Sequence, residues 1–366
     1  MKKQRAVIHI AIGILLTLSP ASVRASYHFS NFQARHPIHV YKYTGSAPQG
    51  LSPDTIKTVY GLPKTGGHGT IAIIGAYDDA TIEKDLSVFS QTFNLPSCTA
   101  TNGCLEKHMM SKKMKSNTGW SLETSLDVEW THAIAPNAKI LLVEATTPSG
   151  ANLLSAVDYA AGRTDVVAVS MSWGGGEFDE EKSLDSHFVS KNGAVFFASS
   201  GDNGWGASWP ASSANVVGVG GTSLSFNKDG SLGHETAWSG SGGGVSANES
   251  QPSYQGGYVI PKANGMRAIP DVSYDADPKS GFSVYDKGKW YILGGTSAGA
   301  PQWAAIQSLG LSANNGNFYT DKASSGNASY FRDIVSGSNG TCTYYCSARK
   351  HYDYVTGLGS PVTVHF

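Results

Sequence analysis

The stretch Thr70-Ile71-Ala72-Ile73-Ile74-Gly75-Ala76-Tyr77 is a continuous apolar run that ends at a pair of aspartates, Asp78 and Asp79. Strands that are buried on both faces of a sheet have such near-continuous apolar runs, whereas half-exposed strands alternate. The stretch therefore predicts a central strand in a sheet that is covered on both sides.

Similar apolar runs recur along the chain, and helical patterns separate them. Further strands are predicted over 138–145, 166–172, 193–199 and 216–219, and helices over 51–60, 80–93, 152–162 and 180–192. Strands that alternate with helices indicate a mostly parallel sheet with helices on both faces, whose functional end is the carboxyl end of the strands. We expect a three-layer α/β fold in one domain.

The first 25 residues have the pattern of a secretory signal peptide. A basic start, Met1-Lys2-Lys3-Gln4-Arg5, precedes an apolar run to about Leu18, and small residues follow up to Ala25. The run is too short to span a bilayer, so a cleaved signal is favoured over a membrane anchor. We expect an exported protein, extracellular or periplasmic, with an N-terminal arm over 26–47 and a single domain over 48–366.

The amino-acid composition indicates which kinds of partner the chain is unsuited to bind. Charged residues make up 15% of the chain and the net charge is −1, which favours neither nucleic acid nor an anionic membrane. We therefore expect no nucleic-acid partner and, once the signal is removed, no membrane contact. We also expect a monomer.

The four cysteines form two close pairs, Cys98 with Cys104 and Cys342 with Cys346. In an exported chain such pairs favour two local disulfides. Zinc is the alternative, but neither pair has the C-x-x-C spacing or a matched pair of histidines.

A glycine-rich turn surrounds one serine near the C-terminal third of the chain. The stretch Gly294-Gly295-Thr296-Ser297-Ala298-Gly299-Ala300-Pro301 leads into an Ala-rich apolar segment. Such a turn places Ser297 at the start of a helix, where backbone N–H groups can stabilise negative charge. An ordinary loop before a surface helix is the alternative, because a nucleophilic serine also needs a base.

Carboxylates are better candidates for that base than histidines. Glu123 and Asp127 are four residues apart, so they share one face of a helix. Two carboxylates this close are unfavourable unless they share a proton, although a solvated acidic face is the alternative. His68 precedes the first strand at the wrong end of the sheet, and His132 is interpreted as a packed or surface histidine.

A third acid, Asp202, follows the strand predicted over 193–199, within Ser200-Gly201-Asp202. By itself it could form a turn or bind a metal.

Four ordered motifs together resemble the sedolisin family of serine-carboxyl peptidases. They are Glu123-x-x-x-Asp127, Ser170-Met171-Ser172-Trp173-Gly174, Ser200-Gly201-Asp202 and Gly295-Thr296-Ser297-x-x-x-Pro301, and the resemblance runs from about Gly50 to Pro361. It implies a subtilisin-like fold, with 48–366 as a peptidase domain that hydrolyses protein or peptide substrates internally at acidic pH.

The resemblance also implies a role for each acid. Ser297 would attack the peptide carbonyl, Glu123 would take its proton, and Asp127 would orient Glu123 and share the proton. Asp202 would donate a hydrogen bond to the oxyanion, which a carboxylic acid can do only while it is protonated. An acidic working range follows.

The family also carries a structural calcium site near its carboxyl end. The matching positions here are the carboxylates of Asp333 and Asp353 and the backbone oxygens of Ile334, Arg349 and His351. Calcium takes six to eight oxygen ligands. Arg349 and His351 stand where the family has glycines, and with Lys350 they add positive charge, so a disulfide-pinned loop without a metal is the alternative.

Other functions fit the sequence less well. A conventional Ser-His-Asp subtilisin lacks a suitable histidine, and the Gly-x-Ser-x-Gly string at 295–299 lacks the downstream Asp and His that a lipase-type fold requires. A catalytically inactive, peptide-binding relative is the alternative from a different class. Only about 20 to 25 residues separate the signal from the matching region, so a large prodomain is not expected.

Overall fold

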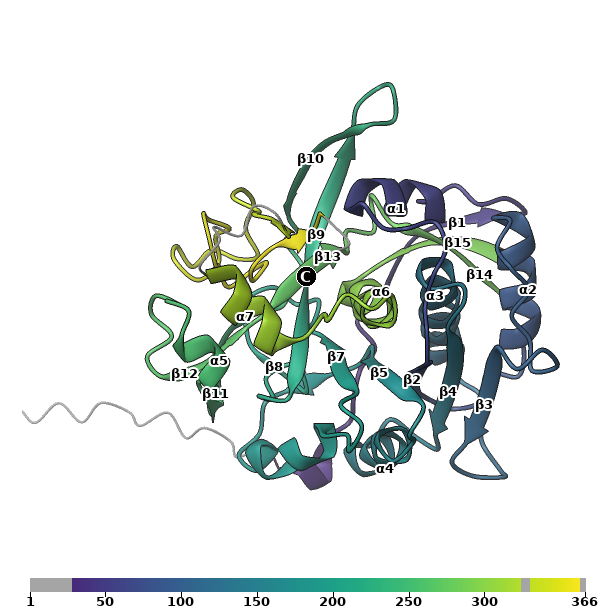
Figure 1. Cartoon of the computed structure of the whole chain (residues 1–366), viewed down its shortest axis with the longest axis horizontal. Helices are drawn as coiled ribbons and strands as arrows, with labels where there is room; N and C mark the ends of the chain where they lie inside the picture. Colours follow the sequence, from purple (N-terminus) through teal and green to yellow (C-terminus); the bar gives the residue numbers. More distant parts are fainter. Residues whose placement is uncertain (1–27, 324–329, 363–366) are drawn as a thin grey trace, which may run out of the picture.

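The computed structural model describes residues 28–323 and 330–362 (Figure 1). The predicted signal peptide, 1–25, lies outside the described residues. No helix in the described ranges combines the length and the apolar character needed to cross a bilayer.

A large, mostly parallel sheet forms the centre of the molecule. Its strands lie in the order β10-β9-β7-β5-β2-β4-β3, with β13 also paired to β9, and only the β10–β9 pair is antiparallel. The strands span β2 Thr70–Ala76, β3 Leu105–Met109, β4 Lys139–Ala145, β5 Val166–Met171, β7 Val195–Ser199, β9 Val216–Phe226, β10 Leu232–Ala237 and β13 Val272–Asp275.

Helices cover both faces of this sheet, as the sequence predicted. On one face lie α2 Ile82–Thr92, α3 Thr118–Ile134 and α6 Gly299–Ser308, and on the other lies α4 Gly150–Ala161 (Figure 1). Strand β2 serves both layers, because Ile71 packs into the core that contains α3 and α6, whereas Ala72 and Ile74 pack with α4. This double burial explains the unbroken apolar run, and the three-layer α/β fold is confirmed.

A smaller antiparallel sheet covers α3 on the side away from the central sheet. It has the order β1-β15-β14, with β1 His39–Gly45, β15 Lys289–Gly294 and β14 Phe282–Asp286. The indole N–H of Trp130 on α3 donates to the carbonyl of Ser283 at 3.0 Å, and its ring packs edge-on against Phe282. Strand β15 runs directly into the turn that carries Ser297, so this sheet fixes where the turn begins.

Shorter elements complete the described structure. They are η1 Phe29–Asn31, α1 Pro53–Tyr60, β6 Gly175–Gly176, η2 Glu181–Phe188, β8 Ser208–Trp209, β11 Gly244–Ser250, α5 Ser253–Gly256, β12 Met266–Ile269, η3 Thr296–Ala298, α7 Asn315–Ala323, β16 Phe331–Arg332 and β17 Ser360–Pro361.

Two predicted elements differ from the observed ones, and one observed strand was not predicted. The helix expected over 180–192 is only the 3-10 segment η2, whose buried residues are Glu181 and Phe188, so it lacks the apolar stripe that holds a longer helix against a core. The strand expected over 216–219 continues as β9 to Phe226. Strand β3 was not predicted, because its sequence is mostly polar and it lies at the edge of the sheet.

Both predicted disulfides are present. Cys98 bonds to Cys104, and Cys342 bonds to Cys346. The N-terminal arm is built into the fold, because its second half forms β1 and pairs with β15.

Candidate active site

Ser297 lies in η3, the tight turn between β15 and α6, and its side chain is buried. The preceding Gly295 has φ +132, a backbone conformation that other residues avoid. A Cβ at this position would lie 2.1 Å from the carbonyl oxygen of Pro37 and 2.6 Å from Oδ2 of Asp202. The glycine therefore permits both the turn and the close approach of these two groups.

The hydroxyl of Ser297 donates to Oε2 of Glu123 at 3.1 Å. Glu123 projects from α3, and its other oxygen, Oε1, is buried with no hydrogen-bond partner among the described residues. The structure thus brings together the serine and the carboxylate that the sequence separates by 174 positions.

Asp127 lies one helical turn after Glu123 and is equally buried. Its Oδ1 accepts a hydrogen bond of 2.7 Å from the hydroxyl of Ser172, which follows β5 and also donates to the carbonyl of Ser297 at 3.2 Å. Burial raises the pKa of Glu123 well above its usual value, and the charge of Asp127 adds to this shift. Burial also raises the pKa of Asp127, which the Ser172 hydrogen bond partly offsets. The surroundings of the pair therefore favour the protonated form of both acids.

Asp202 follows β7 at the carboxyl end of the sheet, as the sequence predicted. Its Oδ1 accepts hydrogen bonds of 2.8 Å from both the backbone N–H and the hydroxyl of Thr296. Burial raises the pKa of Asp202, although His39 and Thr296 act against this shift. The four predicted residues thus converge at one place from α3, from the loop after β7 and from η3.

The N-terminal arm touches three of these four residues. The carbonyl oxygen of Pro37 accepts a hydrogen bond from the hydroxyl of Ser297 and lies 3.4 Å from its backbone nitrogen. Nε2 of His39 lies 3.1 Å from Oδ2 of Asp202, and Nδ1 of His36 lies 3.9 Å from Oε2 of Glu123. The arm therefore lies directly over the candidate catalytic groups.

A cleft of about 600 Å³ opens beside Asp202. One wall is the arm from Asn31 to His39, and the opposite walls are the segments 174–176 and 199–208. A cleft of this size is typical of ligand-binding sites in proteins.

Sequence reasoning missed the roles of Ser172, Thr296 and the arm. Ser172 and Thr296 both lie inside motifs that the sequence shows, and Thr296 directly precedes Ser297, which was the available signal. The contacts of His36, Pro37 and His39 have no such signal, because they depend on how a stretch without periodicity crosses the folded domain.

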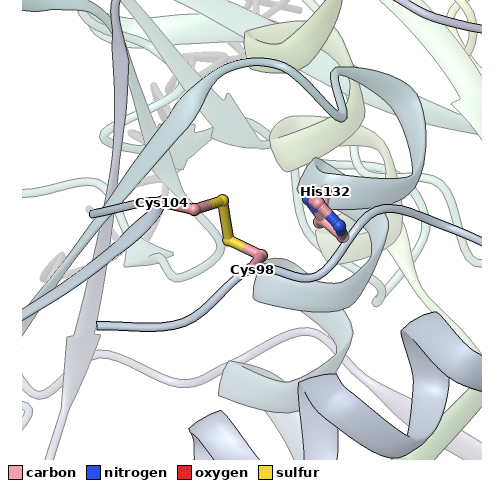
Figure 2. Close-up of side chains that lie close together, drawn as sticks. All are labelled: Cys98, Cys104 and His132. Carbon is pink, nitrogen blue, oxygen red and sulfur yellow. A yellow bond between two sulfur atoms is a disulfide. The ribbon is translucent and has the colours of Figure 1, made fainter. Parts of the chain in front are cut away.

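The histidines set aside in the sequence lie away from Ser297. The Nε2–H of His132 donates to the carbonyl of Pro96 at 2.8 Å, and the ring lies beside the Cys98–Cys104 disulfide (Figure 2). The sulfurs of a disulfide are not the thiolates that bind zinc, so this cluster is structural. The backbone N–H of His68 donates to the carbonyl of Ser308, at the amino end of β2.

The five predicted calcium ligands lie close together in the C-terminal loops. The backbone N–H of His351 donates to Oδ2 of Asp333 at 2.8 Å, and that of Arg349 donates to Oδ2 of Asp353 at 3.1 Å. Asp353 is buried, and burial raises its pKa to about 7. These contacts hold the two carboxylates against the same loop.

The donor chemistry of this loop fits a calcium ion. The carbonyl oxygens of Ile334, Arg349 and His351 accept no hydrogen bond from any described residue. The guanidinium of Arg349 points away, because it lies 4.1 Å from the ring of Tyr344 and donates to the carbonyls of the 343–347 turn. Asp333 and the three free carbonyls therefore remain as oxygen ligands. Asp353 would join them by giving up hydrogen bonds that its two oxygens accept from Arg349, Val355 and Thr356.

The fold is that of a subtilisin-like protein. The sequence model of the subtilase family matches residues 114–326, more than half of the chain. The chain belongs to the subtilase family, and the resemblance to sedolisins predicted from its sequence is confirmed by its relatives.

Two curated relatives carry that resemblance. Sedolisin of Pseudomonas sp. (strain 101) is 28% identical over 365 residues, which cover 85% of this chain and 60% of the relative. Kumamolisin of Bacillus sp. (strain MN-32) is 28% identical over 364 residues, which cover 87% of this chain and 63% of the relative. The chain thus spans less than two thirds of each of these proteins.

A solved structure agrees with the sequence comparison. Pseudomonas sedolisin, a serine-carboxyl proteinase complexed with two molecules of pseudo-iodotyrostatin, superimposes with a TM-score of 0.74 at 27% identity. The match covers 86% of this chain and 96% of that one.

Proposed function

We propose that the chain is a secreted serine-carboxyl endopeptidase that hydrolyses peptide bonds of protein substrates in acid. The observation that carries the proposal is the hydrogen bond from the Ser297 hydroxyl to Glu123, a carboxylate buried next to a second one, Asp127. A serine hydroxyl becomes nucleophilic when a neighbouring base accepts its proton, and these contacts supply such a base.

In this mechanism Ser297 attacks the carbonyl carbon of the peptide bond, and its proton passes to Glu123. Glu123 then gives the proton to the leaving amine, and a water molecule hydrolyses the acyl-enzyme through the same steps. Asp127 shares the proton of Glu123, and Ser172 holds Asp127 in place through the 2.7 Å hydrogen bond.

The oxyanion would be stabilised by the backbone N–H of Ser297 and by protonated Asp202. Oδ1 of Asp202 is already committed to Thr296, so Oδ2 is the oxygen that can carry a proton toward the oxyanion. The raised pKa of Asp202 favours the protonated form in acid. One such donor contributes roughly 100- to 1000-fold in rate.

We also propose that calcium supports the fold at the C-terminal loop. Asp333 and Asp353, with the backbone oxygens of Ile334, Arg349 and His351, would hold the ion. When bound, it supplies charge neutralisation for two carboxylates and joins two loops; it takes no part in peptide hydrolysis.

The experiment compares Ser297→Ala and Glu123→Gln with the natural chain on a denatured protein, between about pH 3 and about pH 8, so that both limbs of the pH profile are seen. Glu129→Gln is the matched control, because Glu129 is another buried carboxylate on α3 whose oxygen accepts from the N–H of Tyr285. Because the arm covers Ser297, each variant is also assayed with His39→Ala. We expect loss of activity in the first two variants and its retention in the control. Full activity in Ser297→Ala or Glu123→Gln would refute the mechanism.

A further inference from the structure

Trp205 is a partly exposed aromatic residue in the wall of the cleft, close in the sequence to Asp202. It is 41% exposed, whereas tryptophan is on average one of the more buried residue types. Its two neighbours are Gly204 and Gly206, which have no side chains that could cover the indole ring. The wall therefore presents an apolar surface beside the candidate catalytic acid.

The backbone around Trp205 is held in place by hydrogen bonds. The N–H of Trp205 donates to the carbonyl of Asn339 at 3.1 Å, and Gly206 exchanges two backbone hydrogen bonds with Gly243, of 2.8 and 3.0 Å. A Cβ at Gly244 would lie 3.2 Å from Cζ3 of the indole, so this glycine leaves room for the ring to pack onto the backbone. The fold thus fixes where the exposed ring lies.

A second aromatic ring, that of Tyr345, supports Trp205 from the C-terminal part of the chain. The two ring centroids lie 5.0 Å apart, with 42° between the ring planes. Tyr345 also packs edge-on against Tyr354 at 5.1 Å, and its hydroxyl donates to the carbonyl of Lys262 at 3.4 Å. Aromatic pairs at these separations are attractive beyond the area that they bury, so Tyr345 stabilises one orientation of the indole.

The disulfide between Cys342 and Cys346 closes the loop that carries Tyr345. The backbone N–H of Asn339 donates to the carbonyl of Cys346 at 3.0 Å, and the carbonyl of the same Asn339 accepts from Trp205. The disulfide loop and the cleft wall therefore share one stretch of backbone contacts.

The walls of the cleft opposite the arm carry little charge. Within the segments 174–176 and 199–208, Asp202 is the one ionisable side chain, and its Oδ1 is bound to Thr296. A charged substrate side chain against this wall would lose hydration without gaining a new ion pair at Trp205. An aromatic or large aliphatic side chain would instead bury apolar surface on the indole.

We propose that Trp205, supported by Tyr345 and the Cys342–Cys346 loop, is a specificity-determining residue that receives an aromatic or large aliphatic side chain of the peptide substrate. The inference rests on the proposed function, because it names the substrate class of that same site. Trp205 contacts the substrate, and Tyr345 is a positioning residue behind it.

A binding experiment without catalysis tests the proposal. The full chain is prepared as Ser297→Ala, so that bound peptide is not cut, and the probes are fluorescent polyalanine peptides with one phenylalanine or one aspartate at each position in turn. Affinity is measured by polarisation at about pH 5, where the aspartate of the probe is mostly charged. The chain also carries Trp205→Ala, Trp205→Lys or Phe226→Ala. Phe226 is the matched control, because it is an exposed aromatic residue that lines a different pocket.

With Trp205 present, we expect the best phenylalanine probe to bind at least about tenfold more tightly than the aspartate probe of the same register, since apolar sites discriminate by about tenfold or more. Trp205→Ala should remove most of this preference, and Phe226→Ala should retain it. Trp205→Lys should shift the preference toward aspartate, a gain that an unfolded protein cannot produce. Equal affinity for the two probes, or a phenylalanine preference that survives both Trp205 substitutions, would overturn the proposal.

The role of Tyr345 is tested by a conservative substitution. Tyr345→Ala should weaken the phenylalanine preference, whereas Tyr345→Phe, which keeps the ring and loses the hydrogen bond to Lys262, should retain it. The double variant Cys342→Ser and Cys346→Ser should behave like Tyr345→Ala. The same preference in all of these variants would contradict a supporting role for the loop.

The two proposals can fail separately. If the chain with Ser297 intact hydrolyses no peptide but probe binding still depends on Trp205, the proposed function fails and the side-chain site stands. If it hydrolyses a denatured protein, and mass spectrometry of the products shows the same residues around the cut bonds with Trp205 and with Trp205→Ala, the side-chain site fails and the function stands.

Discussion

The hydroxyl of Ser172 donates to Oδ1 of Asp127 at 2.7 Å, and this hydrogen bond links the end of β5 to the carboxylate pair on α3. It stabilises the charged form of Asp127 and so lowers the pKa of that acid against the effect of burial. Ser172 therefore acts as a positioning residue whose influence reaches Ser297 through the two acids.

Ser172→Ala should lower the rate of peptide hydrolysis by roughly tenfold or more, because it removes a hydrogen bond to a charged group. It should also move the acidic limb of the pH profile to higher pH, since the pair then holds its protons more tightly. Ser170→Ala is the matched control, because Ser170 is a buried serine of β5 whose hydroxyl has no partner among the described residues. A rate loss with an unshifted acidic limb would mean that Ser172 has a purely structural role.

Asp202→Asn should keep activity in acid and extend it toward neutral pH. The asparagine carbonyl can still accept from Thr296, while its NH₂ replaces the protonated Oδ2 and donates at every pH. Asp202→Ala, which has no donor, should lose roughly 100- to 1000-fold in rate. The measurement is the pH dependence of kcat/KM, and an unchanged alkaline limb in Asp202→Asn would contradict the assigned role.

The free energy of unfolding should decrease as the pH rises from acid to alkaline. Burial raises the pKa of Glu181 from 4.5 to about 9, with the charge of Glu177 as a second cause. A carboxyl with a raised folded-state pKa stabilises the fold fully below about pH 4.5, and that stabilisation is lost as the pH rises to about 9. Burial likewise raises the pKa of Glu249 and of Glu144 to about 7.

Glu181→Gln should flatten this dependence. Gln can accept from the N–H of Phe178 and donate to Ser212, and it has no charge to bury at any pH. We expect a melting temperature near that of the natural chain at about pH 4 and above it at about pH 8. The neighbouring Glu180→Gln is the control, because Glu180 is exposed and should leave the slope unchanged. The same slope in both variants would contradict the assignment.

Calcium should raise the melting temperature through the C-terminal loop. A ligand present at 100 times its dissociation constant stabilises a fold by about 2.7 kcal/mol. Asp333→Asn should lose this response, whereas Asp229→Asn, in the exposed turn before β10, should retain it. Scanning calorimetry with calcium and with a chelator gives the comparison. An identical melting temperature under both conditions would contradict a calcium site.

The strands of the central sheet could be predicted because most of them have an apolar run that is recognisable in the local sequence. Strand β2 is buried on both faces, so its apolar run has no interruption, and the same holds for β4 and β5. Strand β3 escaped prediction because edge position lets Glu106 and Lys107 remain partly exposed. Its place depends on pairing with β4, which the local sequence does not encode.

The candidate site likewise has a part that the sequence predicts and a part that it does not. Glu123, Asp127, Asp202 and Ser297 lie in motifs with fixed spacing, and the structure brings all four together. The arm has no period and no motif, and its contacts span up to 260 positions of sequence. The position of Pro37 depends on the fold of the whole domain and on the pairing of β1 with β15.

That strand pairing has a consequence for the turn that carries Ser297. His39 pairs with Gly294, so the arm and the start of the turn share one stretch of backbone pairing. A substitution that weakens the pairing of β1 with β15 would therefore disturb the position of the Pro37 carbonyl and the geometry of Ser297 together.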